Sequence, residues 1–146
     1  MGADPQQTLR AFREAEAYDG PSLIIAYSHC ISHGIAMREG LDQQYKAVAS
    51  GHWPLMRFNP VRRMQGMNPF LLDSPRPRIS LKEYRKEELR FKMLVNADPE
   101  EAERLLELSQ QEVDRRWADY EAMATSSPEA FAPDARRTTD GRKENA

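Results

Sequence analysis

The residues best suited to chemistry lie in one short stretch, residues 29–33, which reads His-Cys-Ile-Ser-His. Cys30 is the only cysteine among 146 residues. Thiolate and imidazole bind zinc well, but one cysteine and two nearby histidines give at most three ligands, and no second Cys/His pair completes a zinc site. From the residues alone, three interpretations of Cys30 stay open. It is a buried structural cysteine, a nucleophile paired with a histidine, or a thiolate completing a cluster whose other ligands come from distant sequence.

The segment before Cys30 predicts how its thiol is held. Residues 22–28 form a continuous apolar run, which is typical of a strand buried on both faces in a parallel sheet. No second strand of this kind follows, and a lone buried strand cannot satisfy its own N–H and C=O groups. We therefore expect the chain to be a piece of a larger protein. Cys30 then stands at the carboxyl end of a sheet strand, where open α/β sheets bind ligands.

Helices are predicted on both sides of this strand. Asp4 is suited to cap a helix and Pro5 to its first position, so a helix is expected over residues 5–18. After Cys30, apolar residues recur at helical spacing through residues 31–50. Gly34 and Gly40 weaken this second helix by up to about 1 kcal/mol each relative to alanine.

The remainder predicts an extended arm followed by a helical hairpin. Residues 52–79 carry five of the ten prolines, interspersed with aromatic residues and methionine, and this favours an arm packed on a protein surface over a disordered linker. Capping signals at Ser80 and Asp98 predict helices over residues 80–95 and 98–120. The fold class expected is an α/β fragment, mostly helical by content. It has one buried parallel-type strand flanked by helices, then a Pro-rich extended arm and a C-terminal helical hairpin.

Composition excludes several partners and chemistries. Lys and Arg number 21 against 23 Asp and Glu, with no basic stripe, so no nucleic acid is expected. The apolar runs are too short to cross a membrane, and the start lacks the pattern of a signal peptide, so a cytoplasmic location is expected. There is no Gly-rich phosphate loop, GxSxG elbow or HExxH motif. We therefore expect no complete active site in this chain, and no catalytic residue is assigned.

Several long stretches resemble one known family. They are EAEAY (residues 14–18), DGPSLIIAYSHC (19–30), ISHG (31–34), WPLMRFNP (53–60), NPFLLD (68–73) and the helix around residues 105–120. Together they resemble the C-terminal region of the pyruvate:ferredoxin (flavodoxin) oxidoreductases in their long single-chain form. The resemblance covers about residues 4–124, in order. It is specific because it rests on long runs rather than on a short pattern.

The resemblance implies a parent enzyme that oxidatively decarboxylates pyruvate to acetyl-CoA from CoA and passes electrons to ferredoxin or flavodoxin. It implies thiamine diphosphate with Mg²⁺, three [4Fe–4S] clusters and a homodimer. For this chain it implies that Cys30 is the fourth thiolate of the cluster nearest the thiamine. It places residues 1–51 in the C-terminal part of the thiamine-binding domain. The residue patterns divide the rest into the Pro-rich arm (52–79), the helical hairpin (80–124) and a polar tail expected to be disordered (125–146).

The departures from the family pattern are equally informative. The Gly-Asp-Gly and Asn-Thr-Gly motifs for thiamine and Mg²⁺ are absent, as are the other cysteines of the clusters. We therefore expect a chain that begins inside the thiamine-binding domain, partners with the remainder of the parent oxidoreductase, and is inactive alone. The alternative is a stand-alone helical interaction module without catalysis, which keeps the strand as a docking edge.

Overall fold

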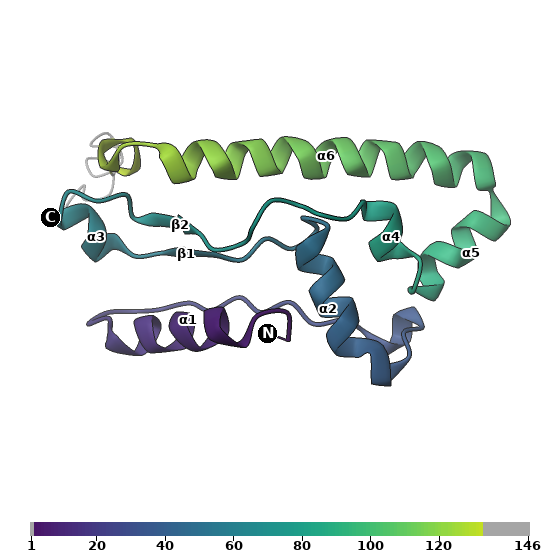
Figure 1. Cartoon of the computed structure of the whole chain (residues 1–146), viewed down its shortest axis with the longest axis horizontal. Helices are drawn as coiled ribbons and strands as arrows, with labels where there is room; N and C mark the ends of the chain where they lie inside the picture. Colours follow the sequence, from purple (N-terminus) through teal and green to yellow (C-terminus); the bar gives the residue numbers. More distant parts are fainter. Residues whose placement is uncertain (1, 133–146) are drawn as a thin grey trace, which may run out of the picture.

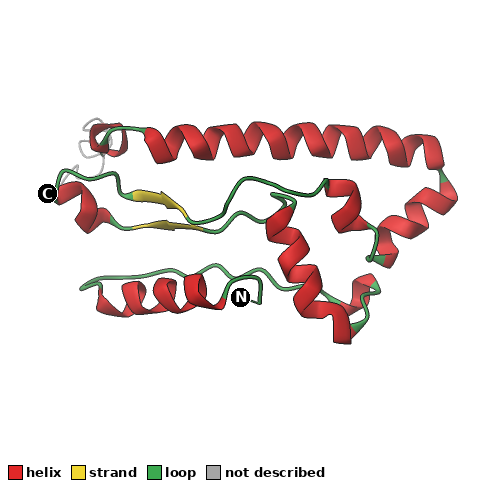
Figure 2. Cartoon of the chain, viewed as in Figure 1, coloured by secondary structure: helices red, strands yellow, loops and turns green. Residues whose placement is uncertain are grey.

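The computed structural model describes residues 2–132, which are mostly helical and include one small sheet (Figure 1, Figure 2). The α-helices are α1 (Pro5–Ala17), α2 (Gly40–Ala49), α3 (Pro60–Met64), α4 (Leu81–Arg85), α5 (Leu89–Ala97) and α6 (Pro99–Thr125); the 3₁₀ turns are η1 (Ile31–His33), η2 (Met37–Glu39) and η3 (Pro128–Phe131); the strands are β1 (Met56–Phe58) and β2 (Phe70–Leu72). The long helix α6 lies along one side, the sheet lies in the middle and α1 lies on the opposite side (Figure 1). None of the helices in this described part is both long and apolar enough to cross a bilayer.

The helix starts follow the local signals in the sequence. The Asp4 side chain accepts hydrogen bonds from the backbone N–H groups of Gln6 and Gln7, and Pro5 occupies the first turn of α1. Asp98 caps α6 in the same way. At the other end of α6, the Asn68 side-chain amide donates to three backbone carbonyls between Met123 and Ser126. These bonds tie α6 to the loop that precedes β2.

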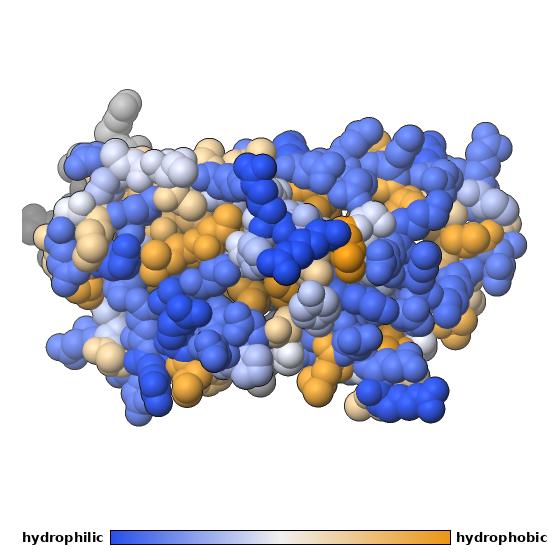
Figure 3. All heavy atoms as spheres, viewed as in Figure 1, coloured by the Kyte–Doolittle hydropathy of each residue, from blue (hydrophilic) through white to orange (hydrophobic). Residues whose placement is uncertain are grey.

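The small core lies where α2, α4 and α6 meet. Its fully buried residues are Ala47, Leu81, Tyr84 and Val113, with Tyr27, Trp53 and Leu106 packed against them. Many other large apolar side chains of the described residues stay exposed. Figure 3 shows such residues as scattered patches among charged ones on one face. The core is therefore small for a chain of this length.

The predicted strand over residues 22–28 is not confirmed, and its predicted burial is wrong for the described residues. Residues 21–30 form neither helix nor strand, and the side chains of Leu23 and Ile25 are 83% and 70% exposed. Within residues 2–132 the only sheet pairs β1 with β2 in antiparallel fashion, Arg57 opposite Leu71. Burial on both faces requires paired strands on either side, and the described residues provide no strand that pairs with this segment.

Two predicted helices are shorter than expected. The helix predicted over residues 31–50 is confirmed only for α2, because Gly34 takes a left-handed conformation (φ 75°) and ends η1. A Cβ atom at Gly34 would lie 2.2 Å from the Leu89 Cβ, so only glycine fits there. The helix predicted over residues 80–95 is broken into α4 and α5. At the break, the buried Glu88 carboxylate accepts a hydrogen bond from Gln43 instead of facing solvent.

The predicted arm and hairpin are changed in detail. Residues 52–79 are not extended throughout, since the helix α3 lies within them and the chain folds back so that β1 pairs with β2. The C-terminal hairpin exists as α5 packed against α6, with α4 as a separate short helix. Of the predicted tail, residues 128–131 form η3, and residues 133–146 lie outside the described residues.

Candidate functional site

Cys30 lies at the end of the extended segment 21–30 and is exposed. It is the N-terminal flanking residue of η1, and its carbonyl oxygen accepts a hydrogen bond of 3.0 Å from the His33 backbone N–H. The structural-cysteine interpretation required burial, and this position does not provide it. The thiol is therefore available to a group or a polypeptide outside the described residues.

The two histidines near Cys30 do not gather into a metal site with it. The His29 ring packs against Gly40, and its Nδ1 lies 3.3 Å from the Gln44 side-chain nitrogen. Among residues 2–132 there is no group of three or more His, Cys, Asp or Glu side chains that could hold a metal ion. The donor set fits one corner of an iron–sulfur cluster, for which a single thiolate is enough, and does not fit a complete site.

An aromatic cluster holds the segment just before Cys30. The Tyr27 hydroxyl lies 2.5 Å from the Tyr84 hydroxyl, and the Tyr27 ring stacks on Trp53 with 5.3 Å between centroids. Burial, followed by the bond to Tyr27, raises the pKa of Tyr84 well above its ordinary value. Burial also lowers the pKa of His52, which stacks on Tyr84, and the positive charge of Arg116 adds to this effect. Both shifts favour the neutral forms of Tyr84 and His52.

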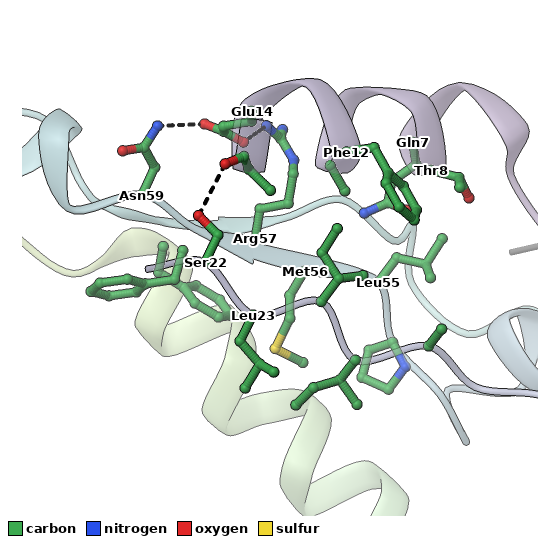
Figure 4. A pocket seen from close by; sticks show the side chains of 18 of the residues that line it. Gln7, Thr8, Phe12, Glu14, Ser22, Leu23, Leu55, Met56, Arg57 and Asn59 are labelled. Carbon is green, nitrogen blue, oxygen red and sulfur yellow. Dashed lines mark hydrogen bonds and ion pairs between the residues drawn. The ribbon is translucent and has the colours of Figure 1, made fainter. Parts of the chain in front are cut away.

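A groove of about 700 Å³ runs between α1, residues 21–27 and β1 (Figure 4). Its walls are largely apolar and include Phe12, Leu23 and Met56. In Figure 4, Ser22 bonds across to α1, where its hydroxyl donates to the Ala15 carbonyl at 3.0 Å. The groove lacks a group of free polar side chains converging on one point, so it does not by itself suggest catalysis.

Ion pairs centred on Arg57 close one end of this groove. The Arg57 guanidinium donates to both carboxylate oxygens of Asp73, at 2.8 and 2.9 Å, and to Glu14 at 2.6 Å. Asn59 donates to the second Glu14 oxygen, and Gln7 donates to Asp73. Because Glu14 and Gln7 belong to α1, this network joins α1 to the sheet.

The same network sets the acid–base behaviour of its carboxylates. Burial alone would raise the pKa of Glu14, but hydrogen bonds from Asn59 and Arg57 outweigh it and hold the pKa below the ordinary value of 4.5. For Asp73, burial is likewise outweighed by bonds from Arg57 and Gln7, which lower its pKa below 3.8. A lowered folded-state pKa stabilises the fold above the unfolded-state pKa, and this contribution is lost as the pH falls through the lowered value.

Sequence reasoning missed both the Arg57 network and the Tyr27–Tyr84 contact. Each joins residues far apart in the chain, at separations of 43 residues for Arg57–Glu14 and 57 for the tyrosine pair. One usable signal was present, since Arg57 and Asp73 each border an apolar stretch within residues 53–73. Opposite charges that border two short apolar stretches close in the sequence form a pair if those stretches align side by side.

No family model matches the chain. The chain is 53% identical over 125 residues to the pyruvate-flavodoxin oxidoreductase of Nostoc sp., a match that covers 86% of this chain and 10% of the relative. It is 49% identical over 119 residues to the pyruvate-flavodoxin oxidoreductase of Rhodospirillum rubrum, covering 81% of this chain and 10% of the relative. It is 43% identical over 124 residues to the pyruvate:ferredoxin oxidoreductase of Moorella thermoacetica, covering 85% and 11%.

These matches extend over most of the chain but over a small part of each relative. The chain spans about a tenth of the length of the curated relatives it matches. Identities between 43% and 53% over more than 110 residues indicate common ancestry rather than a shared motif. The chain is therefore homologous to one segment of the pyruvate-flavodoxin and pyruvate:ferredoxin oxidoreductases.

Proposed function

We propose that this chain is the C-terminal segment of the thiamine-binding domain of a pyruvate:ferredoxin or pyruvate-flavodoxin oxidoreductase, and that Cys30 supplies one thiolate of a [4Fe–4S] cluster. The parent reaction is oxidative decarboxylation of pyruvate to acetyl-CoA, with electrons passed to ferredoxin or flavodoxin. When bound, the cluster carries single electrons. The other thiolates and the thiamine diphosphate site come from polypeptide outside this chain. The unpaired thiol is consistent with a cytoplasmic enzyme.

The observation that carries this proposal is an exposed apolar segment that ends at an exposed thiol. Leu23 and Ile25 are 83% and 70% exposed and lie seven and five residues before Cys30. Burying an apolar side chain of this size stabilises a protein by about 1.5–3 kcal/mol. The chain does not gain this stabilisation by itself, because its core is small and both side chains stay exposed. We therefore expect residues 22–28 to be covered by the remainder of the enzyme, and this contact brings Cys30 to the cluster.

The other elements have supporting roles in this proposal. The Arg57 network holds α1 against the sheet, and the groove between them lies beside residues 21–27. Helix α6 contributes Val113 to the core from which Tyr84 contacts Tyr27, and α5 packs against α6. None of these residues bonds to Cys30, so their role is to fix the segment rather than to take part in electron transfer.

Anaerobic incubation of the isolated chain with ferrous iron and sulfide tests whether it holds a cluster alone. We expect no stoichiometric [4Fe–4S] cluster and no pyruvate-dependent reduction of a viologen dye, because one thiolate cannot hold a cluster that takes about four. The positive control is a chimaeric enzyme in which residues 2–132 replace the matching segment of the Nostoc enzyme. A stable cluster with about four irons in the isolated chain would contradict the proposal. If the chain is instead a stand-alone interaction module, the chimaera should lose one cluster.

A further inference from the structure

The extended segment 21–30 is not held by strand pairing, yet its end is fixed in space. The segment lies outside the sheet, and most of its side chains are exposed. Within it, Tyr27 and His29 are the only residues that are partly buried. These two residues lie three positions and one position before Cys30, so contacts at their side chains decide where the sulfur is presented.

Tyr27 is held from three sides. Its hydroxyl bonds to the hydroxyl of Tyr84, which is fully buried in the core. Its ring stacks on Trp53 and meets the edge of the His52 ring, with 5.9 Å between centroids. The two hydroxyl oxygens lie 2.5 Å apart, which is hydrogen-bond distance. The bond joins a core residue to a segment that is otherwise exposed, and burial of the two rings does not require it, so the contact is specific.

His29 and the turn after Cys30 form the second point of attachment. A Cβ atom at Gly40 would lie 2.5 Å from two atoms of the His29 ring, so the ring rests directly on the backbone of α2. Gln44 lies within hydrogen-bond distance of the same ring. On the other side of Cys30, Gly34 packs against Leu89 with no room for a side chain. The backbone is thus held on both sides of the cysteine.

We infer that Tyr27 and His29 are positioning residues for the Cys30 sulfur, with Tyr27 held in place by Tyr84. This inference rests on the proposed role of Cys30 as a cluster ligand. Neither side chain is a ligand. They fix the backbone on which the thiolate stands before the remainder of the enzyme covers it. Side chains that orient a metal ligand without binding the metal change metal affinity or activity by about 10–100-fold when they are removed.

The lone cysteine allows a direct test on the chain itself. A nitroxide spin label attached to the exposed Cys30 reports the motion of the backbone that carries it. In Tyr27→Ala its rotational correlation time should shorten by about three-fold relative to the wild-type chain, because the backbone is no longer held at residue 27. Tyr27→Phe keeps the stack on Trp53 and loses only the bond to Tyr84, so it should fall between these values. Ser22→Ala is the matched control, since its exposed bond to Ala15 lies at the far end of the segment.

A second arm uses the loaded chimaeric enzyme. In Tyr27→Ala and Tyr27→Phe, a chelator should remove iron from one cluster faster, by about ten-fold in the alanine variant, and the electron paramagnetic resonance signal of that cluster should broaden. The control in this arm is Thr125→Ala, because the exposed Thr125 hydroxyl bonds to carbonyls of its own helix and lies outside residues 22–28; it should change neither. Circular dichroism checks that each variant keeps its helical content, and Tyr27→Phe serves if the alanine variant does not fold.

The outcomes separate this inference from the proposed function. If label motion and iron loss are unchanged in both Tyr27 variants while Cys30→Ser loses a cluster, the positioning role is wrong and the ligand role stands. If Cys30→Ser keeps every cluster, the ligand role is wrong, and the positioning role falls with it. A mobile label together with faster loss from a single cluster supports the inference.

Discussion

Replacing Cys30 by serine in the chimaeric enzyme should remove the iron of one [4Fe–4S] cluster, about four atoms per chain, and abolish electron transfer to ferredoxin or flavodoxin. A serine hydroxyl is a much poorer ligand for an iron–sulfur cluster than a thiolate. The thiamine-dependent step should be partly retained, because in the proposed function the thiamine diphosphate site is supplied by polypeptide outside this chain. Iron analysis, electron paramagnetic resonance and acceptor reduction measure the three effects.

The control for this substitution is Thr125→Ala, since the exposed Thr125 hydroxyl bonds to carbonyls of its own helix and lies outside residues 22–28. It should keep all clusters and full electron transfer. An unaltered iron count in Cys30→Ser would refute the ligand assignment. Loss of every cluster would instead indicate that the enzyme failed to assemble, and the retained thiamine-dependent step tells these two results apart.

Replacing Arg57 by methionine should lower the free energy of unfolding of the isolated chain by about 3 kcal/mol. The side chains of Arg57 and Asp73 are 17% and 10% exposed, so removal of the guanidinium leaves Asp73 without its counter-charge in a largely water-free position. Glu14 loses its ion pair as well, and α1 is then held to the sheet only by weaker contacts. Urea unfolding followed by circular dichroism measures the change.

Arg76→Met is the matched control. Arg76 also binds one carboxylate, that of Glu121, through two nitrogens, but its side chain is 78% exposed. Exposed pairs of this kind contribute about 0.2–1 kcal/mol. The pKa values of Glu14 and Asp73 are lowered in the folded state. The loss of unfolding free energy caused by Arg57→Met should therefore be full above about pH 5 and become smaller as the pH falls. Equal effects of the two substitutions would contradict the assigned role of the network.

Local features of the fold could be predicted from the sequence, because neighbouring residues decide them. Asp4 with Pro5 and Asp98 with Pro99 begin α1 and α6 as expected, since a cap needs only its own first turn. Helix ends were less predictable. Gly34 ends η1 because its backbone lies against Leu89, a residue 55 positions later, and no spacing pattern reports that contact.

Burial and long-range pairing could not be predicted in the same way. The apolar run at residues 22–28 is typical of a buried strand, but burial depends on the neighbours that a segment finds, and the described residues leave it exposed. The Arg57–Asp73 pair depends on how β1 and β2 are aligned, and the Tyr27–Tyr84 bond on how α4 meets the segment. Cys30 was assigned as a candidate ligand from the family resemblance, whereas the side chains that hold it were not identified.

Amide hydrogen exchange over residues 22–28 tests most directly whether polypeptide outside this chain completes its fold. In the isolated chain these amides should exchange within seconds, as in an open loop, while amides in the middle of α6 stay protected. In the chimaeric enzyme the same amides should be slowed by orders of magnitude, because neighbouring strands accept their hydrogen bonds. Strong protection in the isolated monomer, or none in the assembled enzyme, would contradict this account.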